Sequence, residues 1–389
     1  MSNIKLREGI YWVGAIDWNI RSFHGYTTQM GSTYNAYLII DEKITLIDTV
    51  KSNFSQELID RVSKIVDPAK IDYLISNHVE MDHSGSIPEI MKLIPNAQLI
   101  TSSPNGLKGL TAHYGAHYNY KAVKAGEILN LGARNIVFVQ TPMLHWPDNM
   151  VAYCPEEKIL FSNDAFGQHY SSNLHFDDEV NINDAFSEAS KYYANILMPF
   201  GSQVQKALDA IAPLDIEIIA PSHGIIWRAN VAKIIEKYRK WSSNENDGSA
   251  LIIYDTMWHS TEKIAVRMAE CFAEKGITAK ILDLKENHMS DIMNYMLSAK
   301  YVAVGSPTLN NNMMPTVAAF LTYLKGLAPK GKIGLAFGSY GWSGQSIGDI
   351  EGILIAAGFQ MPCDKLKIQY IPTSQQLEDI NKEILKMII

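Results

Sequence analysis

Metal-binding side chains are concentrated in one stretch of the sequence, Asn77-His78-Val79-Glu80-Met81-Asp82-His83-Ser84-Gly85. Four imidazole or carboxylate groups fall within six positions there, directly after residues 73–76, whose apolar character predicts a β-strand. A loop at the end of a strand lets side chains of different length converge on one cation. The stretch therefore predicts a metal site at the edge of a sheet, with four candidate ligands: His78, Glu80, Asp82 and His83.

Three further candidates occupy comparable places later in the chain. They are His145 after the predicted strand 136–140, Asp164 after 159–162, and His223 after 216–220. A single histidine or aspartate at a strand end is more often a cap or loop residue, so these three gain their support from the cluster. If all the strands end at one edge, the seven side chains meet there. Four imidazoles and three carboxylates suffice for two cations, with one carboxylate bridging them.

The first part of the chain is rich in predicted strands, some joined by hairpins and others separated by helices. Residues 36–40 and 44–47 flank a polar turn and predict a hairpin. A helical pattern at 87–93 follows Ser86, which with Glu89 predicts a capping box. Hairpins mixed with helices indicate an α/β sandwich rather than a purely parallel sheet.

A polar, glycine-containing segment at 241–249 predicts a domain boundary, with domains at residues 1–248 and 249–389. Beyond it, strands and helices alternate strictly. The predicted strands are 251–254, 279–284, 301–305, 332–337 and 366–370; the first helix is 262–275, and Gly276 follows it as a C-cap. Five strands alternating with helices predict a doubly wound parallel sheet, similar to that of flavodoxin.

Composition limits the classes of function. The net charge of −7 and the lack of a basic stripe argue against nucleic acid as a partner. No apolar run approaches the ~18 residues of a transmembrane helix, so no membrane partner is expected. Residues 1–8 do not have the pattern of a signal peptide.

The three cysteines, Cys154, Cys271 and Cys363, are far apart, which predicts a reducing, cytoplasmic compartment. Because no Cys-x-x-Cys pair exists, the chain is not expected to build its own four-cysteine iron centre. An electron carrier of that kind would be a separate protein.

Three loops of the second part predict a flavin site at the ends of its strands. The loop at 255–261 opens a helix with hydroxyls and backbone amides, which can hold a phosphate. It is similar to the phosphate loop of flavodoxins, and it lacks the glycines of a nucleoside triphosphate loop. The candidate FMN residues are Thr256, Met257, Trp258, His259, Ser260 and Thr261 here, Ser306, Pro307, Thr308, Asn310 and Asn311 in the second loop, and Ser339, Tyr340, Gly341, Trp342, Ser343 and Gly344 in the third. Any one of these loops alone would be an ordinary strand-to-helix turn.

The ligand cluster resembles that of the metallo-β-lactamase fold, whose zinc hydrolases have His-x-His-x-Asp-His. This sequence has Glu80 where those hydrolases have histidine. Together with Leu144-His145-Trp146-Pro147-Asp148 and Ala220-Pro221-Ser222-His223-Gly224, that change makes the whole chain similar to A-type flavodiiron proteins. The additional carboxylate also shifts metal preference from zinc toward iron or manganese.

The resemblance implies an αββα metallo-β-lactamase-like sandwich followed by a five-stranded flavodoxin-like domain, holding two iron ions and FMN. One iron would be bound by His78, Glu80 and His145, the other by Asp82, His83 and His223, and Asp164 would bridge them. Two further residues match family positions near the irons, and His24 and Tyr193 are therefore expected to supply protons or hydrogen bonds to the substrate. The role of His169 stays open between a supporting and a purely structural one.

The resemblance further implies reduction of dioxygen to water, of nitric oxide to nitrous oxide, or of both. The expected electron donor is rubredoxin, and reduced deazaflavin is the alternative. A head-to-tail homodimer, or a dimer of such dimers, would bring each flavin to the partner's irons beside Trp146. Two other classes of function stay open from the residues alone: a metallo-hydrolase with a flavodoxin-like appendage, and an electron carrier with a structural first domain.

Overall fold

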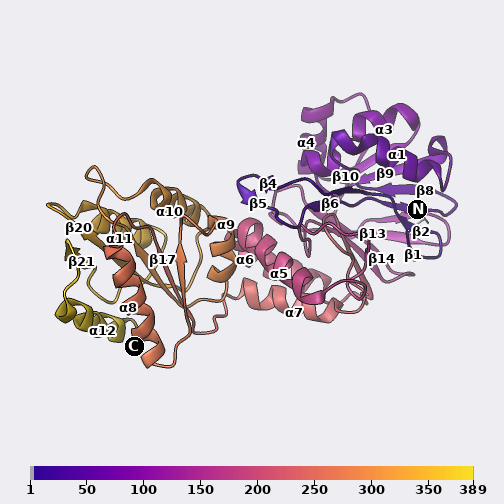
Figure 1. The fold of residues 1–389 in the computed structure, drawn as a ribbon. Coiled ribbons are helices and arrows are strands. Elements are labelled where there is room, and N and C mark those ends of the chain that lie inside the picture. Colours follow the sequence, from indigo (N-terminus) through magenta and orange to yellow (C-terminus); the bar gives the residue numbers. More distant parts are fainter. Residues whose placement is uncertain (1–3, 389) are drawn as a thin grey trace. The chain divides into compact units, whose positions relative to one another are not determined.

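The computed structural model describes residues 4–388, which form two compact units (Figure 1). The first unit contains residues 4–24, 28–192 and 202–239, and the second contains 25–27, 193–201 and 240–388. The predicted α/β architecture, a sandwich followed by a doubly wound sheet, is confirmed. The border predicted between residues 248 and 249 stays a prediction.

The first unit is built on two sheets. The seven-stranded sheet runs in the order β1 (Ile4–Arg7), β2 (Ile10–Trp12), β7 (Tyr37–Ile39), β8 (Ile44–Ile47), β9 (Ile71–Ser76), β10 (Gln98–Ser102), β11 (Tyr120–Val123). The five-stranded sheet runs β12 (Ile128–Asn130), β13 (Asn135–Gln140), β14 (Met150–Cys154), β15 (Ile159–Asn163), β16 (Ile218–Pro221). Two further strand pairs are short: β3 (Ala15–Asp17) with β6 (Ser32–Tyr34), and β4 (Ser22–Phe23) with β5 (Tyr26–Thr27), of which β5 is counted with the second unit.

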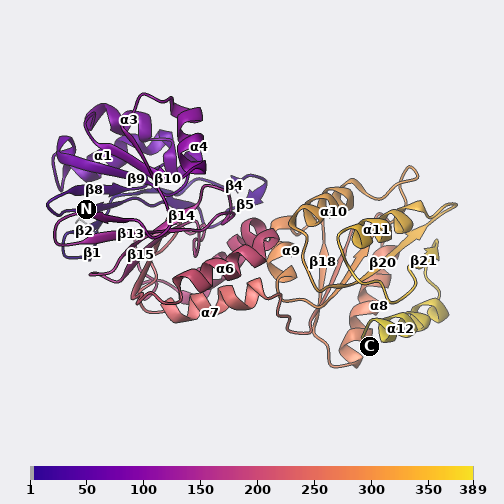
Figure 2. The same cartoon turned by 180° about the vertical axis from the view of Figure 1, so that it is seen from behind.

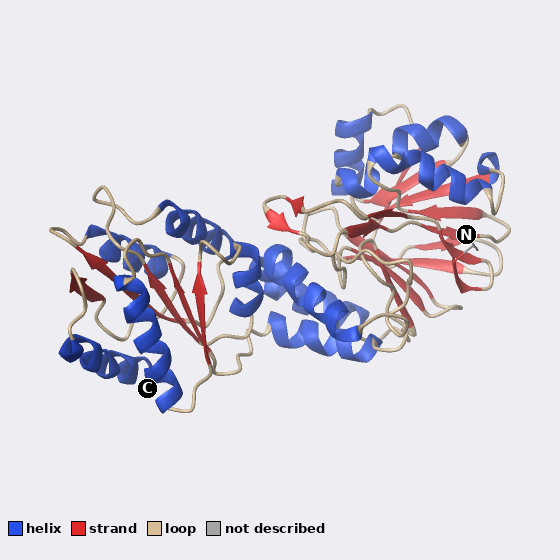
Figure 3. Cartoon of the chain, viewed as in Figure 1, coloured by secondary structure: helices blue, strands red, loops and turns tan. Residues whose placement is uncertain are grey.

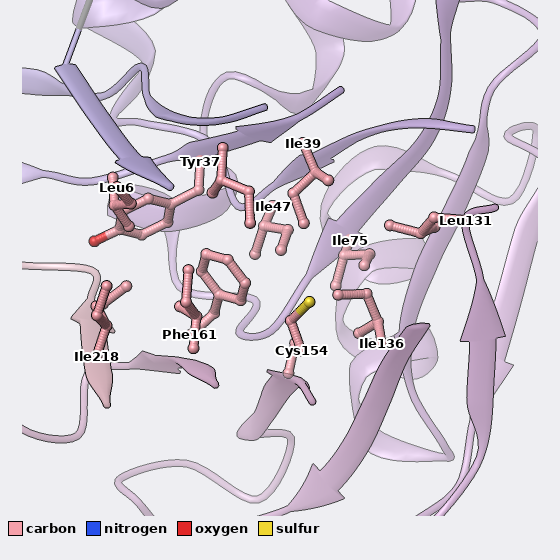
Figure 4. Packing of buried hydrophobic residues seen from close by; sticks show 14 of the residues in the cluster. Leu6, Tyr37, Ile39, Ile47, Ile75, Leu131, Ile136, Cys154, Phe161 and Ile218 are labelled. Carbon is pink, nitrogen blue, oxygen red and sulfur yellow. The ribbon is translucent and has the colours of Figure 1, made fainter. Parts of the chain in front are cut away.

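Strand periodicity explains why the seven-stranded sheet is buried on both faces. Successive side chains of a strand point to opposite faces. In β9, Ile75 packs between the two sheets, whereas Leu74 packs against helices. Ile136 and Phe161 of the five-stranded sheet complete the core between the sheets, where Cys154 is also buried (Figure 4).

Helices cover the outer faces of the sandwich, as the helix and strand colours of Figure 3 show. The helical segments of residues 52–114 are η1 (Ser52–Phe54), α1 (Ser55–Ser63), η2 (Pro68–Lys70), α2 (Met81–Ser84), α3 (Ile87–Leu93) and α4 (Asn105–Tyr114). Those that follow β15 are α5 (Ile182–Tyr192), α6 (Gly201–Ile211) and α7 (Val231–Ser242). The π-helix Tyr193–Leu197 and η4 (Met198–Phe200), which lie between α5 and α6 in the chain, belong to the second unit. Leu58 of α1 and Ile90 of α3 pack on the seven-stranded sheet, while Val204 of α6 and Tyr238 of α7 lie beside Leu160 of β15.

Two local predictions differ from the structure. The hairpin of β7 and β8 is confirmed as an antiparallel pair, but the capping box is wrong. Ser86 makes no cap hydrogen bond and its hydroxyl donates to the carbonyl of Val50 at 2.7 Å, because a tertiary partner outcompetes the local one. The ligand loop also continues into α2, since the carbonyl of Glu80 accepts the amides of His83 and Ser84.

The second unit is a parallel sheet in the order β18 (Ala279–Asp283), β17 (Ala250–Tyr254), β19 (Tyr301–Gly305), β20 (Ile333–Tyr340), β21 (Leu366–Gln369). Its helices are α8 (Ser260–Glu274), α9 (Met289–Met296), α10 (Pro315–Leu327), α11 (Gln345–Ala356) and α12 (Ser374–Ile388). Figure 2 shows α8 and α12 on one face, with α10 and α11 on the other. The sheet order reverses between β17 and β19, and ligands of such sheets bind at that switch point.

Across residues 4–388, none of the helices combines the length and the apolar character needed to cross a membrane. The three cysteines are all buried and free.

Candidate diiron and flavin sites

The seven predicted ligands meet in two groups within the first unit. One consists of His78, Glu80, His145 and Asp164, and the other of Asp82, His83 and His223, with the candidate ligand atoms of each group within 4.8 Å of one another. The loops after β9 and β15, the α2 turn and the loop after β16 supply six of them, and His145 comes from the connection between β13 and β14. The strand ends thus bring the seven residues together, as the sequence predicted.

Asp164 faces both groups, one with each carboxylate oxygen. Its Oδ2 lies 3.6 Å from Nε2 of His78 and 3.6 Å from Nε2 of His145. Its Oδ1 lies 3.0 Å from Nε2 of His83 and 3.5 Å from Nε2 of His223. This is the arrangement that a carboxylate bridging two cations requires.

The spacing of the ligand atoms fits a cation in each group. Glu80 Oε2 is 3.3 Å from His78 Nε2 and 3.2 Å from His145 Nε2, and Asp82 Oδ2 is 3.2 Å from His223 Nε2. Ligand atoms roughly 2.0–2.2 Å from one ion, at angles near 90–110°, are roughly 3.0–3.6 Å apart. Both carboxylate oxygens of Asp82 are buried without a hydrogen-bond partner among the described residues, as expected of groups that serve a cation.

The electrostatics of the groups favour ionised carboxylates. Burial would raise the pKa of Asp164, but the neighbouring His83 and His78 imidazoles offset burial and hold that pKa well below its ordinary value. Conversely, Asp82 and Asp164 raise the pKa of His83 to about 9 against the effect of burial. Cation binding must therefore displace protons from the imidazoles, which couples metal uptake to pH.

Supporting residues orient two of the imidazoles. Asp148 Oδ2 accepts Nδ1–H of His78 at 2.8 Å and the amide of Val79 at 2.8 Å. The carbonyl of Thr33 accepts Nδ1–H of His223 at 2.7 Å. Such bonds leave Nε2 free to face the cation. Asp148 was not predicted as a supporting residue, although its position three residues after His145 in the Leu144–Asp148 motif was a usable signal.

The expected proton donors lie in different surroundings. His24 Nε2 is 2.9 Å from Glu80 Oε1, with its side chain 71% exposed, so it is placed at the edge of the candidate site. Tyr193 is buried, and its ring centroid lies 5.2 Å from that of Trp241. The hydroxyl of the preceding Tyr192, which was not predicted from the sequence, donates to Asp164 Oδ1 at 3.0 Å.

Two other aromatic residues border the groups. His169 is fully buried and is outside both groups; its Nδ1 is 2.7 Å from Ser32 Oγ, and burial together with His223 holds its pKa well below the ordinary value. Trp146 stands edge-on to His78, with ring centroids 5.1 Å apart, and is partly exposed. A supporting role for His169 and a flavin-facing role for Trp146 stay predictions.

The second unit has a cleft of about 710 Å³ at the carboxyl ends of its strands. Twelve of the predicted flavin residues line it: Met257, Trp258, Ser260, Pro307, Thr308, Asn310, Asn311, Ser339, Tyr340, Gly341, Trp342 and Ser343. Thr256, His259, Thr261, Ser306 and Gly344 are not among the lining residues. Leu309, Tyr370 and Ile371 line the cleft as well and were missed. The last two follow β21, so the rule applied to the other strand ends would have found them.

The cleft fits a flavin phosphate at the loop between β17 and α8. The Thr256 hydroxyl is almost fully buried and has no hydrogen-bond partner among the described residues. A buried hydroxyl without a partner, in a loop that leads into the N-terminus of a helix, is suited to an anion such as a phosphate. Thr261 Oγ1 lies 2.9 Å from Ser339 Oγ and joins this loop to the one after β20.

The fold and the two sites define a class of protein: a metallo-β-lactamase-like domain with a two-cation site, followed by a flavodoxin-like domain. Family models described as "ODP family beta lactamase" and "Flavodoxin" match residues 33–224 and 252–383. The nitric oxide reductase of Moorella thermoacetica is 45% identical over 381 residues, which are 96% of this chain and 95% of that protein. The chain belongs to the flavodiiron protein family, whose cofactors are FMN and two irons.

Solved structures agree over the full length. Rubredoxin oxygen:oxidoreductase from Desulfovibrio gigas has a TM-score of 0.97 and 41% identity, covering 100% of this chain and 98% of its own. The flavodiiron protein from Giardia intestinalis has a TM-score of 0.95 and 33% identity, with the same coverage.

Proposed function

We propose that this chain reduces dioxygen to water, nitric oxide to nitrous oxide, or both, with electrons from an external donor. The observation that carries the proposal is Asp164, whose two oxygens face two complete ligand groups. FMN bound in the cleft and an iron pair held by the seven candidate ligands would supply the electron-transfer chemistry that this reduction needs. Glu80 in place of the hydrolase histidine, together with the flavin cleft, argues against a metallo-hydrolase.

The chain's own residues hold protons and shape the site. His24 Nε2 at Glu80 Oε1 can carry a proton at the exposed edge of the ligand groups. The Tyr192 hydroxyl orients Asp164 by donating to Oδ1. Phe23 lies against His24 and His169, with ring centroids 4.2 and 5.1 Å apart, and gives that edge an apolar wall suited to small neutral gases.

The proposal includes rubredoxin as the donor and the cytoplasm as the location. The name of the D. gigas relative, rubredoxin oxygen:oxidoreductase, supports the first. Three buried, free cysteines support the second.

Steady-state kinetics with each gas and rubredoxin as donor test the function. We expect a larger kcat/KM for dioxygen than for nitric oxide, because four-electron reduction takes up four protons from a site supplied with donors. Tyr192→Phe should lower the dioxygen constant about tenfold, because a hydrogen bond to a charged group is lost. Tyr193→Phe is measured beside it, because Tyr193 is the residue expected from the sequence to supply a proton or hydrogen bond, and a loss of similar size there would support that role. A parent that turns over neither gas would contradict the proposed function. A larger loss in Tyr193→Phe than in Tyr192→Phe would assign the hydrogen-bonding role to Tyr193 instead of Tyr192.

The proposal also includes a head-to-tail homodimer in which the flavin of one chain faces the irons and Trp146 of the other. Trp258 and Trp342 are 86% and 90% exposed at the flavin cleft, beside the exposed Tyr370 and Ile371. A contiguous exposed apolar rim of this kind marks an interaction surface.

Complementation of two inactive chains tests the dimer. Mixing the Asp164→Ala chain with the Ser260→Ala/Thr261→Ala chain should restore roughly one quarter of parental activity, because half of the dimers are mixed and each has one intact pair of sites. Differently tagged chains allow the mixed dimers to be isolated and counted. Isolated mixed dimers without activity would show that transfer occurs within one chain.

A further inference from the structure

A buried carboxylate lies directly beneath the loop where the flavin phosphate is expected. Asp255 is 1% exposed; its Oδ1 accepts the amide of Thr256 at 2.6 Å and its Oδ2 accepts the hydroxyl of Thr316. These bonds fix the carboxylate at the end of β17. A phosphate monoester carries about −1.5 to −2 charges at pH 7, so an uncompensated carboxylate here would repel it.

Lys285 supplies a positive charge at this point. Its Nζ donates to the carbonyl of Thr256 at 2.7 Å and lies 3.4 Å from Asp255 Oδ1. The loop 255–261 itself contains no lysine or arginine. Lys285 comes instead from the turn after β18, which the parallel pairing of Tyr254 with Asp283 brings beside the end of β17.

The Thr256 side chain is a second, independent sign that this loop binds a ligand. The Thr256 hydroxyl is buried and has no hydrogen-bond partner among the described residues, although its own carbonyl is engaged by Lys285. A buried hydroxyl of this kind normally has a partner, and a phosphate oxygen would be one.

We infer that Lys285 is a positioning residue for FMN: its ammonium group neutralises Asp255 and fixes the Thr256 carbonyl, so that the loop can accept a doubly charged phosphate. The inference rests on FMN being the bound flavin, as in the proposed function. Lys285 assists the hydroxyls and amides of the loop and does not replace them. Its side chain is 48% exposed, so solvent screening limits the effect.

Titration of the apoprotein with flavin, followed by flavin fluorescence, tests the inference. Lys285→Met and Lys285→Gln should each raise the Kd for FMN about tenfold, equivalent to about 1.4 kcal/mol. Lys285→Arg, which keeps the charge, should stay within about threefold of the parent. Lys280→Met is the matched control, because Lys280 lies on β18, just before the turn that carries Lys285, and its ammonium lies over the Tyr295 ring, 3.9 Å from the centroid.

Riboflavin and a double variant separate the mechanisms. Riboflavin has no phosphate, so its Kd should be the same in the parent and in Lys285→Met; an equal loss for riboflavin would mean that the fold is disturbed and would overturn the inference. In the Asp255→Asn background, Lys285→Met should change the FMN Kd less than about twofold, because no carboxylate is left to neutralise. An undiminished tenfold effect there would overturn the role of Asp255. A parent apoprotein that binds no FMN contradicts the proposed function itself.

Discussion

Replacement of Asp164 by alanine is expected to abolish turnover and to lower the iron content below one per chain, while the FMN spectrum stays intact. The reason is geometric: Oδ1 and Oδ2 face different ligand groups, so the substitution removes one ligand from each cation at once. Loss of a group that only supports a metal ligand lowers metal affinity or activity about 10–100-fold, and loss of a bridging ligand should lower them at least as much. Turnover with each gas and iron analysis after anaerobic purification measure the effect.

Asp209→Ala is a suitable control for this variant, because Asp209 is on the surface of the same unit and, among residues 4–388, forms an ion pair with Arg239 alone. It should keep two irons and full activity. An Asp164→Ala chain that retained both irons and parental turnover would contradict the bridging assignment.

The double variant Ser260→Ala/Thr261→Ala is expected to lose FMN during purification while keeping its iron. Each hydrogen bond to a charged group contributes about 1.5–3 kcal/mol, so losing two should weaken FMN binding by about 10²–10⁴-fold. Part of the loss is expected because Ser339, whose hydroxyl contacts that of Thr261, would lose this partner in the variant. The iron groups lie in the other unit, so the iron content should not change.

Flavin content after extensive dialysis, together with iron analysis, measures this effect. Thr322→Ala is the control, because Thr322 is exposed and its hydroxyl donates to the carbonyl of Ala318 within α10. A double variant that retained its full FMN content would place the phosphate elsewhere in the cleft.

Much of the fold follows from local patterns. The strand predicted at residues 73–76 lies within β9, and the hairpin predicted around residues 41–43 is formed by β7 and β8. Both could be predicted because the pattern of apolar residues along a chain indicates its strands. The regular alternation after residue 250 likewise predicted a parallel sheet whose order, β18-β17-β19-β20-β21, is that of flavodoxin. The capping box at Ser86 failed because its hydroxyl found a tertiary partner in Val50.

Side-chain contacts between distant segments were harder to predict from the sequence. In Lys191-Tyr192-Tyr193-Ala194 two adjacent tyrosines are chemically equal, but successive residues of a helix point about 100° apart. Only the helix orientation decides that the hydroxyl of Tyr192 reaches Asp164. The same limit applied to Lys285, whose contact with Asp255 depends on the pairing of β17 with β18.

The sequence by itself determined the types of chemical group and their order along the chain: four imidazoles, three carboxylates and three flavin loops, each placed after a strand. Parallel strands end at one edge, so the meeting of these groups was predictable without coordinates. Tertiary structure decided how the groups are shared. The two oxygens of Asp164 face different ligand groups, and His78 donates a hydrogen bond to Asp148. Lys285 lies beside the carboxylate of Asp255, next to the loop where the flavin phosphate is expected. These pairings depend on distances of a few ångströms between segments far apart in the chain. Tertiary packing sets those distances, and the local sequence does not determine them.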